Sequence, residues 1–209
     1  MAESSPLGHP LDAGTSNRER WGWYLFDFAN SILIMNGGLY FPQWIVIDNG
    51  VSALWFNLVF TLSTLLLLVT GPLLGILSDR GWGRVSFLRY TSAAMFIGGC
   101  VIGFGGRFIA DRDVRVASSL AGFFVIMYCY QLSLIFYNVL LARVSLPHQA
   151  ARVSGRGFSW GWVGGIAAVL FILPFVHGKI PLFQPGGRIQ AILPSTLIFG
   201  MLTTASLLW

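Results

Sequence analysis

Asp27 stands inside a long apolar stretch, where its carboxylate would be able to bind a solute or a proton. Asn30 and Ser31 follow by three and four positions, a spacing that predicts one shared helical face, and Gly38 continues that face. A carboxylate at the centre of a bilayer costs roughly 2.5–3.5 kcal/mol. This polar face therefore predicts a water-filled cavity. The alternative is that Asp27 lies near the membrane surface and ties its helix to nearby arginines as a structural clamp.

The other reactive side chains do not form a catalytic or metal-binding pattern. His9, His148 and His177 lack metal-ligand spacing. Cys100 and Cys129 each stand in an apolar run, which favours a role as small buried residues. An intramembrane enzyme needs at least two convergent catalytic groups, and the apolar runs offer one carboxylate. The sequence predicts no enzyme, no cofactor and no metal.

The composition is that of a membrane protein. Hydrophobic residues make up 55% of the chain and charged residues 10%, whereas soluble domains carry about a quarter charged residues. The 17 Phe, 8 Trp and 6 Tyr suit a lipid-facing surface with interfacial aromatic anchors. The net charge of +5 lies mostly between apolar runs, so we interpret it as topology and lipid headgroup contact rather than nucleic-acid binding.

Six apolar stretches are long enough, or nearly so, to cross a membrane as helices, which need about 20 residues. They are 21–47, 53–77, 87–106, 117–142, 158–176 and 192–209. Barrel strands would be shorter and would alternate, so the predicted fold class is an all-α polytopic membrane protein with a polar cytoplasmic tail at 1–20. The last stretch has no flanking charge, and the expectation is that 21–209 is a bundle truncated at its C-terminal end, or half of something larger.

Basic residues between the apolar runs predict the orientation. Eight lie on the side of the N-terminus: Arg18, Arg20, Arg80, Arg84, Arg89, Arg143, Arg152 and Arg156. Five lie on the other side: Arg107, Arg112, Arg115, Lys179 and Arg188. Because cytoplasmic loops carry the excess of Lys and Arg, the N-terminus is predicted to be cytoplasmic.

The segment 75–84 reads GILSDRGWGR and joins two apolar runs, as a short cytoplasmic turn between membrane helices would. It resembles the signature loop between the second and third helices of the major facilitator superfamily. Two features depart from the pattern: Trp82 makes the distance from Asp79 to Gly83 one residue longer, and Val85 stands where a second basic residue is common.

Three further stretches are similar to the vacuole-effluxer-like (autophagy-related permease) branch and its bacterial relatives. They read WYLFDFANS at 23–31, FYNVLL at 136–141, and RVSGRG at 152–157 running into GWVGG at 161–165. The resemblance implies the N-terminal six-helix half of a facilitator, whose first and fourth helices line a central cavity. It makes Gln131, Tyr137 and Asn138 candidate solute contacts, although polar side chains in membrane helices also hydrogen-bond neighbouring helices.

The resemblance also implies a gating loop, with plain positive-inside anchoring as the alternative. Its residues would be Gly75, Asp79, Arg80, Gly83 and Arg84. Separately, glycines spaced by four leave flat faces that favour close helix packing. They include Gly71, Gly157, Gly161 and Gly165.

The predicted function is secondary active transport of a small solute by alternating access. The resemblance implies amino acids or similar metabolites, an efflux permease, and the bacterial plasma (inner) membrane. The expected partners are the lipid bilayer, the solute, and a missing C-terminal six-helix half or a second copy of the chain, with no nucleic acid. The alternative is a truncated or half-size membrane module that has an assembly or regulatory role and transports nothing by itself.

Overall fold

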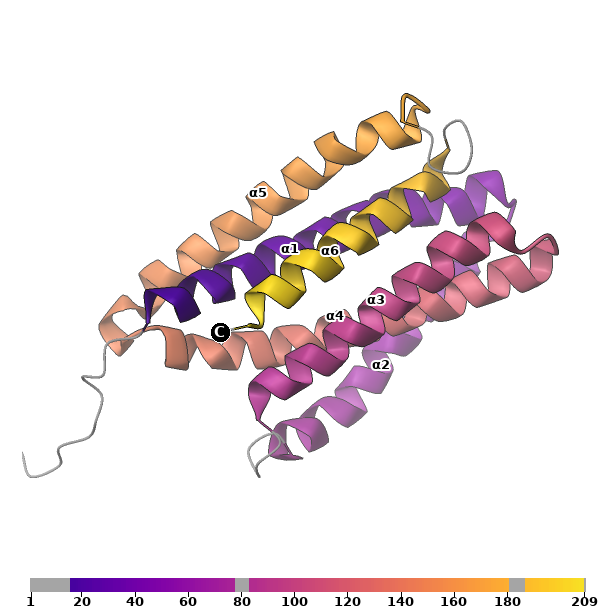
Figure 1. Cartoon of the computed structure of the whole chain (residues 1–209). Helices are drawn as coiled ribbons and strands as arrows, with labels where there is room; N and C mark the ends of the chain where they lie inside the picture. Colours follow the sequence, from indigo (N-terminus) through magenta and orange to yellow (C-terminus); the bar gives the residue numbers. More distant parts are fainter. Residues whose placement is uncertain (1–15, 78–82, 181–186, 209) are drawn as a thin grey trace, which may run out of the picture.

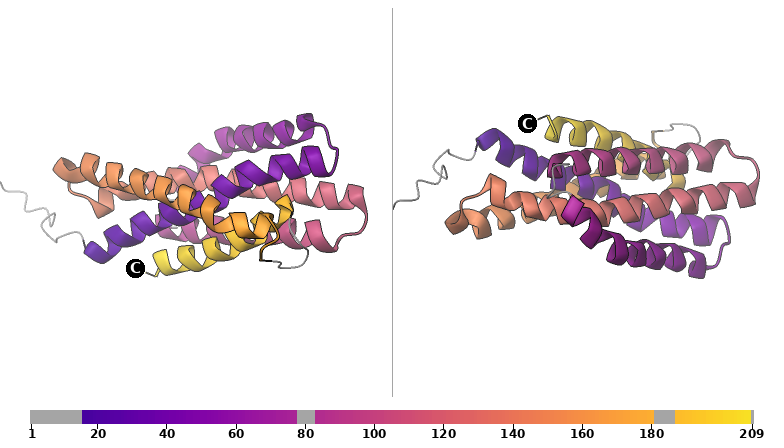
Figure 2. Two further views of the ribbon diagram at one scale, coloured as in Figure 1. Left: turned by 90° about the horizontal axis from the view of Figure 1, so that it is seen from above. Right: turned by 90° about the horizontal axis from the view of Figure 1, so that it is seen from below.

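The computed structural model describes residues 16–77, 83–180 and 187–208, and it is built from helices packed side by side (Figure 1). The longer helices are α1 (Asn17–Gln43), α2 (Ala53–Leu77), α3 (Arg84–Phe108), α4 (Arg112–Val144), α5 (Ala150–Val176) and α6 (Ile192–Ser206). The short helices are a π-helical turn η1 (Trp44–Asp48) and the 3-10 turns η3 (Pro147–Gln149) and η4 (Arg188–Ala191). The start of α1 and the end of α6 lie at the same end of the bundle (Figures 1 and 2).

Five helices within the described residues are long and apolar enough to cross a membrane, and they make the chain a helical membrane protein. These five are α2, α3 and α4, together with α5 and α6 and the short turns that precede them. The helix at the first predicted span, α1, is not among them. Its polar residues Asp27, Asn30 and Asn36 lower its hydropathy, although α1 is 27 residues long and packs inside the bundle.

The helices differ from the predicted spans mainly at their ends. The first span was predicted to reach residue 47, but the α-helix ends at Gln43 and continues as the π-helical turn. The fourth was predicted from residue 117, yet α4 begins at Arg112 because the Asp111 carboxylate accepts a hydrogen bond from the Val114 amide, at 2.9 Å. α5 begins at Ala150, eight residues before the predicted span, because a helix extends beyond the apolar segment that the membrane requires.

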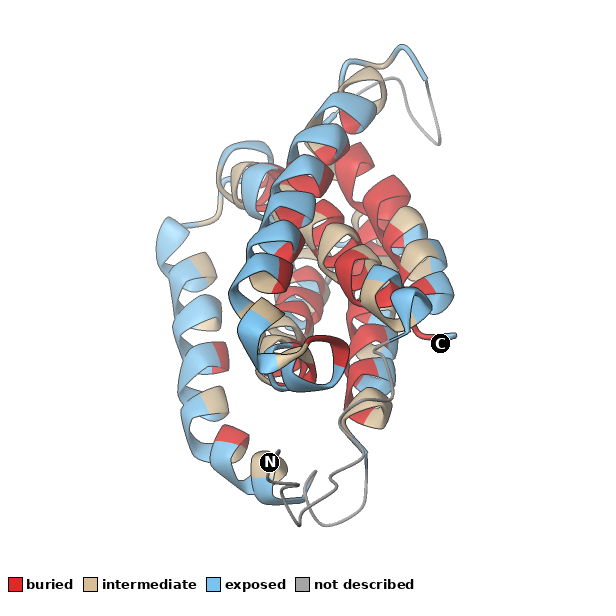
Figure 3. Ribbon diagram, turned by 90° about the vertical axis from the view of Figure 1, so that its left-hand side faces the viewer, coloured by how far each residue is buried: buried red, intermediate tan, exposed pale blue. Residues whose placement is uncertain are grey.

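Glycine backbones bring the helices of the core into close contact. A Cβ atom on Gly98 of α3 would lie 2.8 Å from the carbonyl oxygen of Gly122 on α4, and one on Gly122 would lie 2.9 Å from the carbonyl oxygen of Gly98. The buried Asn36 amide of α1 donates to Ser195 Oγ of α6 at 2.9 Å. Buried faces turn toward the middle of the bundle and exposed faces turn outward (Figure 3).

α2 is the least buried of the long helices, and polar contacts attach it to α4. Thr64 Oγ1 donates to Gln131 Oε1 at 3.1 Å, and the Gln131 amide nitrogen donates to Ser63 Oγ at 3.3 Å. About two turns further along α2, the hydroxyls of Thr70 and Tyr128 hydrogen-bond at 2.8 Å. Most of the remaining α2 side chains are exposed Leu, Phe, Val and Trp, as suits a helix facing lipid.

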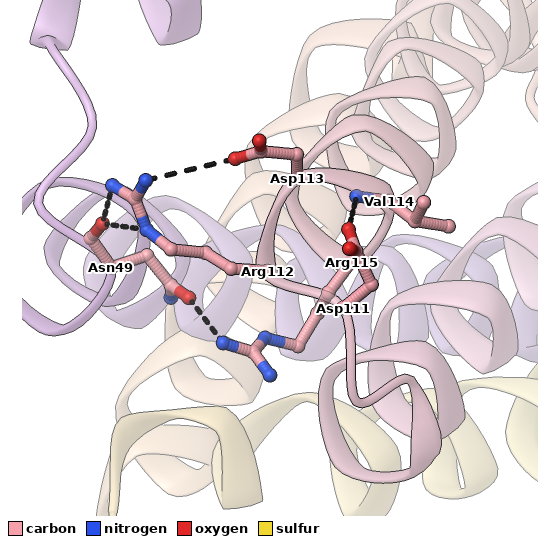
Figure 4. A network of polar contacts seen from close by, with 6 residues as sticks. All are labelled: Asn49, Asp111, Arg112, Asp113, Val114 and Arg115. Atoms are coloured by element: carbon pink, nitrogen blue, oxygen red, sulfur yellow. Dashed lines mark hydrogen bonds and ion pairs between the residues drawn. The ribbon is translucent and has the colours of Figure 1, made fainter.

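Arginines join the loops at the end of the bundle where α4 begins (Figure 4). Arg112 donates to the Asn49 carbonyl oxygen, with its Nε at 3.0 Å, and Arg115 donates to the Asn49 side-chain oxygen at 3.3 Å. Asn49 in turn donates to the Trp44 carbonyl oxygen at 2.9 Å. At the same end Arg188 pairs with Asp48. These contacts fasten the α1–α2 connection to the α3–α4 turn and to the start of α6.

The contact between α3 and α4 gives a stability prediction. The variant Gly98→Ala places a methyl group against the Gly122 carbonyl, so we expect it to separate the helices at a cost of about 1–3 kcal/mol. Thermal unfolding of the purified protein in detergent should show a lower Tm. The control is Gly155→Ala on α5, where a new Cβ meets nothing within 4 Å. Equal melting temperatures for the two variants would contradict the close contact.

Candidate functional site

A cavity of about 640 Å³ lies between α1, α4 and α5. Its α1 wall consists of Trp23, Asp27, Ser31, Ile34, Met35, Gly38 and Leu39. Its other walls consist of Tyr130, Leu134, Tyr137 and Asn138 from α4 and Ser154, Phe158, Gly161 and Trp162 from α5. On each helix these residues recur every three or four positions, so each helix turns one face to the cavity.

Asp27 and Ser31 lie against α5 because residue 161 is a glycine. A Cβ atom at Gly161 would lie 2.5 Å from Asp27 Oδ2 and 3.2 Å from Ser31 Oγ. Any larger residue would push the carboxylate away or displace the helix. Asp27 has no hydrogen bond or ion pair to any residue that the structure describes, so its carboxylate is available to the cavity.

Trp23 and Tyr137 form the rigid end of the cavity. Their rings are stacked, with centroids 4.3 Å apart and planes 5° apart. The Trp23 indole also donates to the Tyr137 carbonyl oxygen at 3.0 Å. These two contacts satisfy the indole and fix the tyrosine ring, but the buried Tyr137 hydroxyl has no hydrogen-bond partner within the described part of the chain. A Cβ at Gly157 would meet the Trp23 ring, so this glycine admits the aromatic pair beneath α5.

The cavity brings together four of the six predicted solute or proton contacts. Asp27, Ser31, Tyr137 and Asn138 all line it. Asn30 does not, although the spacing predicted that it would share a face with Asp27 and Ser31. At about 100° per residue, positions three and four residues on from Asp27 diverge to opposite sides of it, and Asn30 turns into the bundle, where it is 1% exposed.

Gln131 is the sixth predicted contact, and it lies on the side of α4 that faces α2. Its side-chain oxygen accepts from Thr64 and its nitrogen donates to Ser63 and to the Met127 carbonyl oxygen. These bonds occupy the amide in helix packing. The same residue was predicted to be either a solute contact or an interhelical hydrogen-bonding group, and its observed contacts are of the second kind.

The predicted gating loop lies partly outside the described residues. Asp79 and Arg80 belong to that part, so the gating prediction stays a prediction. Gly75 lies inside the last turn of α2. It has open space around it, since a Cβ there would meet nothing within 4 Å. Gly83 precedes α3 with φ of 69°, a left-handed conformation that favours glycine. Arg84 is the first residue of α3.

The glycines predicted to pack helices lie in two interfaces. Gly71 of α2 faces Ile135 of α4, and a Cβ atom added at Gly71 would lie 3.4 Å from the Ile135 Cδ1 atom. Gly157, Gly161 and Gly165 of α5 face α1, where a Cβ on Gly165 would lie 2.9 Å from the Met35 Cε atom.

Several residues of the cavity and its walls were not predicted. Ser154, Phe158 and Trp162 line the cavity from α5. Their spacing of four, beside Gly161, is the signal that would have identified this face. Gly164 was also missed, and a Cβ there would lie 2.6 Å from the Phe28 carbonyl oxygen, so this glycine lies against the α1 backbone.

Within residues 16–77, 83–180 and 187–208, His, Cys, Asp and Glu side chains do not gather into a group of three that would hold a metal ion. The chemistry of the cavity is therefore that of one carboxylate, hydroxyl and amide groups, and aromatic rings.

Comparisons with protein-family models, with curated proteins and with solved structures find no significant match.

Water access to the cavity is testable by thiol labelling. In a background with Cys100→Ala and Cys129→Ala, we expect Ser31→Cys to react with a hydrophilic methanethiosulfonate reagent, because thiols in a hydrated cavity ionise. The matched control is Ser133→Cys on α4, whose side chain is fully buried outside the cavity. Equal protection of both cysteines would show that water does not reach the site.

Proposed function

We propose that the chain is a secondary transporter that moves a small solute across a membrane by alternating access. The observation that carries this proposal is the cavity between α1, α4 and α5, with the Asp27 carboxylate in its wall. Ionisable residues inside membrane proteins are costly, and they commonly mark solute or proton pathways. A volume of about 640 Å³ is in the range of pockets that enclose small molecules.

The arrangement of the helices supports a facilitator-type half. In this proposal α1 is a sixth membrane span, shielded by its neighbours, and the three sequence stretches that resemble the vacuole-effluxer-like branch meet around one space. Asp27 and Ser31 come from the first stretch, Tyr137 and Asn138 from the second, and Gly161 from the third. Residues far apart in the sequence therefore form one polar surface.

The cavity is open on one side, so another protein surface would be needed to enclose a solute there. Its lining residues Leu39, Phe158 and Trp162 are 40%, 67% and 54% exposed. A continuous transport pathway needs a second bundle opposite this face, either a C-terminal six-helix half or a second copy of the chain. The exposed rings would then lie in the interface.

Charge at the two ends of the bundle supports a cytoplasmic N-terminus. Arg143 pairs with Glu19 at 3.2 Å, and Arg20 donates to the Val144 carbonyl oxygen at 3.3 Å, so two of the arginines predicted to be cytoplasmic lie at one end of the bundle. The Asn49, Arg112 and Arg115 network lies at the other. In a bacterial plasma membrane the first group would face the cytoplasm.

The test is counterflow in proteoliposomes that contain the purified chain. Vesicles loaded with one unlabelled solute are given the same solute in tritiated form, using neutral, zwitterionic and cationic compounds in turn. We expect accumulation of at least one of them, and we expect Asp27→Asn to lower it because the carboxylate that contacts the solute or its coupled proton is lost.

The pattern of loss separates the roles of Asp27. Loss of gradient-driven uptake with counterflow retained would assign the proton to this carboxylate, and loss of both would assign the solute. Asp113→Asn is the matched control, since Asp113 is exposed in the first turn of α4 and lies outside the cavity. Absence of counterflow with every solute would contradict transport by this chain and favour the assembly or regulatory module.

A further inference from the structure

We infer that the cavity between α1, α4 and α5 binds a solute with a positively charged ammonium group on a compact apolar or aromatic body. The inference rests on the proposed function, because it names the solute class of the same site. The charge, the rings and the hydrogen-bonding groups of the cavity wall support this solute class.

The fixed charge of the cavity wall has one sign. Asp27 is acidic, and the other described residues of the lining are apolar, aromatic, hydroxyl or amide side chains, with no Lys, Arg or His among them. A carboxylate in surroundings of low dielectric constant attracts a cation strongly and repels an anion. A zwitterionic amino acid would place its own carboxylate in a cavity that offers no basic group to receive it.

The nearest arginines do not change this sign. Arg152 and Arg156 stand two residues on either side of Ser154, and two residues are more than half a helical turn, so both lie on the exposed side of α5. Arg143, at the cytoplasmic end, pairs with Glu19. None of these three arginines lines the cavity with Asp27.

Aromatic rings suit a cation as well as an apolar body. Trp23, Tyr130 and Tyr137 approach from α1 and α4, and Phe158 and Trp162 from α5. The faces of such rings attract ammonium groups within about 6 Å, most strongly for tryptophan. The stacked Trp23 and Tyr137 rings are held by the indole hydrogen bond, so this part of the wall is preorganised.

The remaining groups match the two ends of such a solute. Ser31 lines the cavity one helical turn from Asp27, so its hydroxyl can accept a hydrogen bond from an ammonium N–H. Ile34, Met35 and Leu134 supply apolar surface for the body of the solute. A cation alone would leave this surface hydrated, which is why the inference includes an apolar body.

The experiment compares four probes of similar size by isothermal titration calorimetry on the purified full chain, with empty micelles as the blank. The probes are benzylammonium, benzyl alcohol, phenylacetate and phenylalanine. A charge-assisted contact should make benzylammonium bind about tenfold more tightly than benzyl alcohol. Phenylacetate and phenylalanine should bind more weakly than benzylammonium. Equal affinity for the ammonium and the alcohol, or tighter binding of the anion or the zwitterion, would overturn the inference.

Two variants and a control locate the ammonium. Asp27→Asn should remove the preference for benzylammonium over benzyl alcohol, whereas Asp113→Asn, the matched change at an exposed site, should keep it. If Asp27→Asn does not fold, Trp162→Ala decides, because Trp162 is 54% exposed and its truncation leaves the core intact. It should weaken benzylammonium several-fold and benzyl alcohol less, as loss of a cation–π contact predicts. An unchanged preference in these variants would place the cation elsewhere.

The outcomes for the solute class and for transport are separable. Selective binding of benzylammonium without counterflow of any solute would keep the ammonium site and contradict transport. Counterflow of a neutral or zwitterionic solute without selective ammonium binding would keep transport and contradict the ammonium site.

Discussion

The close approach of α1 to α5 is the contact on which the candidate site depends. Gly157, Gly161 and Gly164 remove side chains from the face of α5 that α1 crosses, and the space they leave is taken by the Trp23 ring, the Asp27 carboxylate and the Phe28 carbonyl. In lipid, helices gain little from excluding apolar surface, so van der Waals contact between small residues and interhelical hydrogen bonds must hold them together. The same glycines that allow this contact also leave the space that the Asp27 carboxylate occupies beside α5.

That constraint explains why one carboxylate can be accommodated without a basic partner among the described residues. Asp27 lies where α1 approaches α5, but it also lines the cavity, so water or a ligand can solvate it. The aromatic pair of Trp23 and Tyr137 forms a firm boundary on one side, because the indole is bonded to the α4 backbone. The open side, toward Phe158 and Trp162, is the part that a further protein surface would have to close.

The rest of the bundle holds this site in place through different contacts in the middle of the bundle, at the end where α4 begins, and along α2. The backbones of Gly98 and Gly122 bring α3 and α4 together in the middle. At the end where α4 begins, Arg112 and Arg115 fasten the loop at Asn49. α2 is attached through hydroxyl and amide groups and through the packing of Phe56, Leu67 and Leu74 against the core, and most of its other side chains face outward.

The sequence by itself determined the fold class and the approximate position of each helix, because long apolar runs with charge between them have few other solutions in lipid. It also identified Asp27 as a residue of the cavity, since a carboxylate inside an apolar run is visible in the sequence alone. It did not determine which face each side chain takes. Asn30 and Gln131 were grouped with cavity residues by spacing, but helix rotation turned Asn30 into the core and Gln131 toward α2. Only the tertiary structure decided that Ser154, Phe158 and Trp162 join Asp27, because contacts between helices depend on how their faces are rotated and crossed, and the period of one helix carries no information on its neighbour.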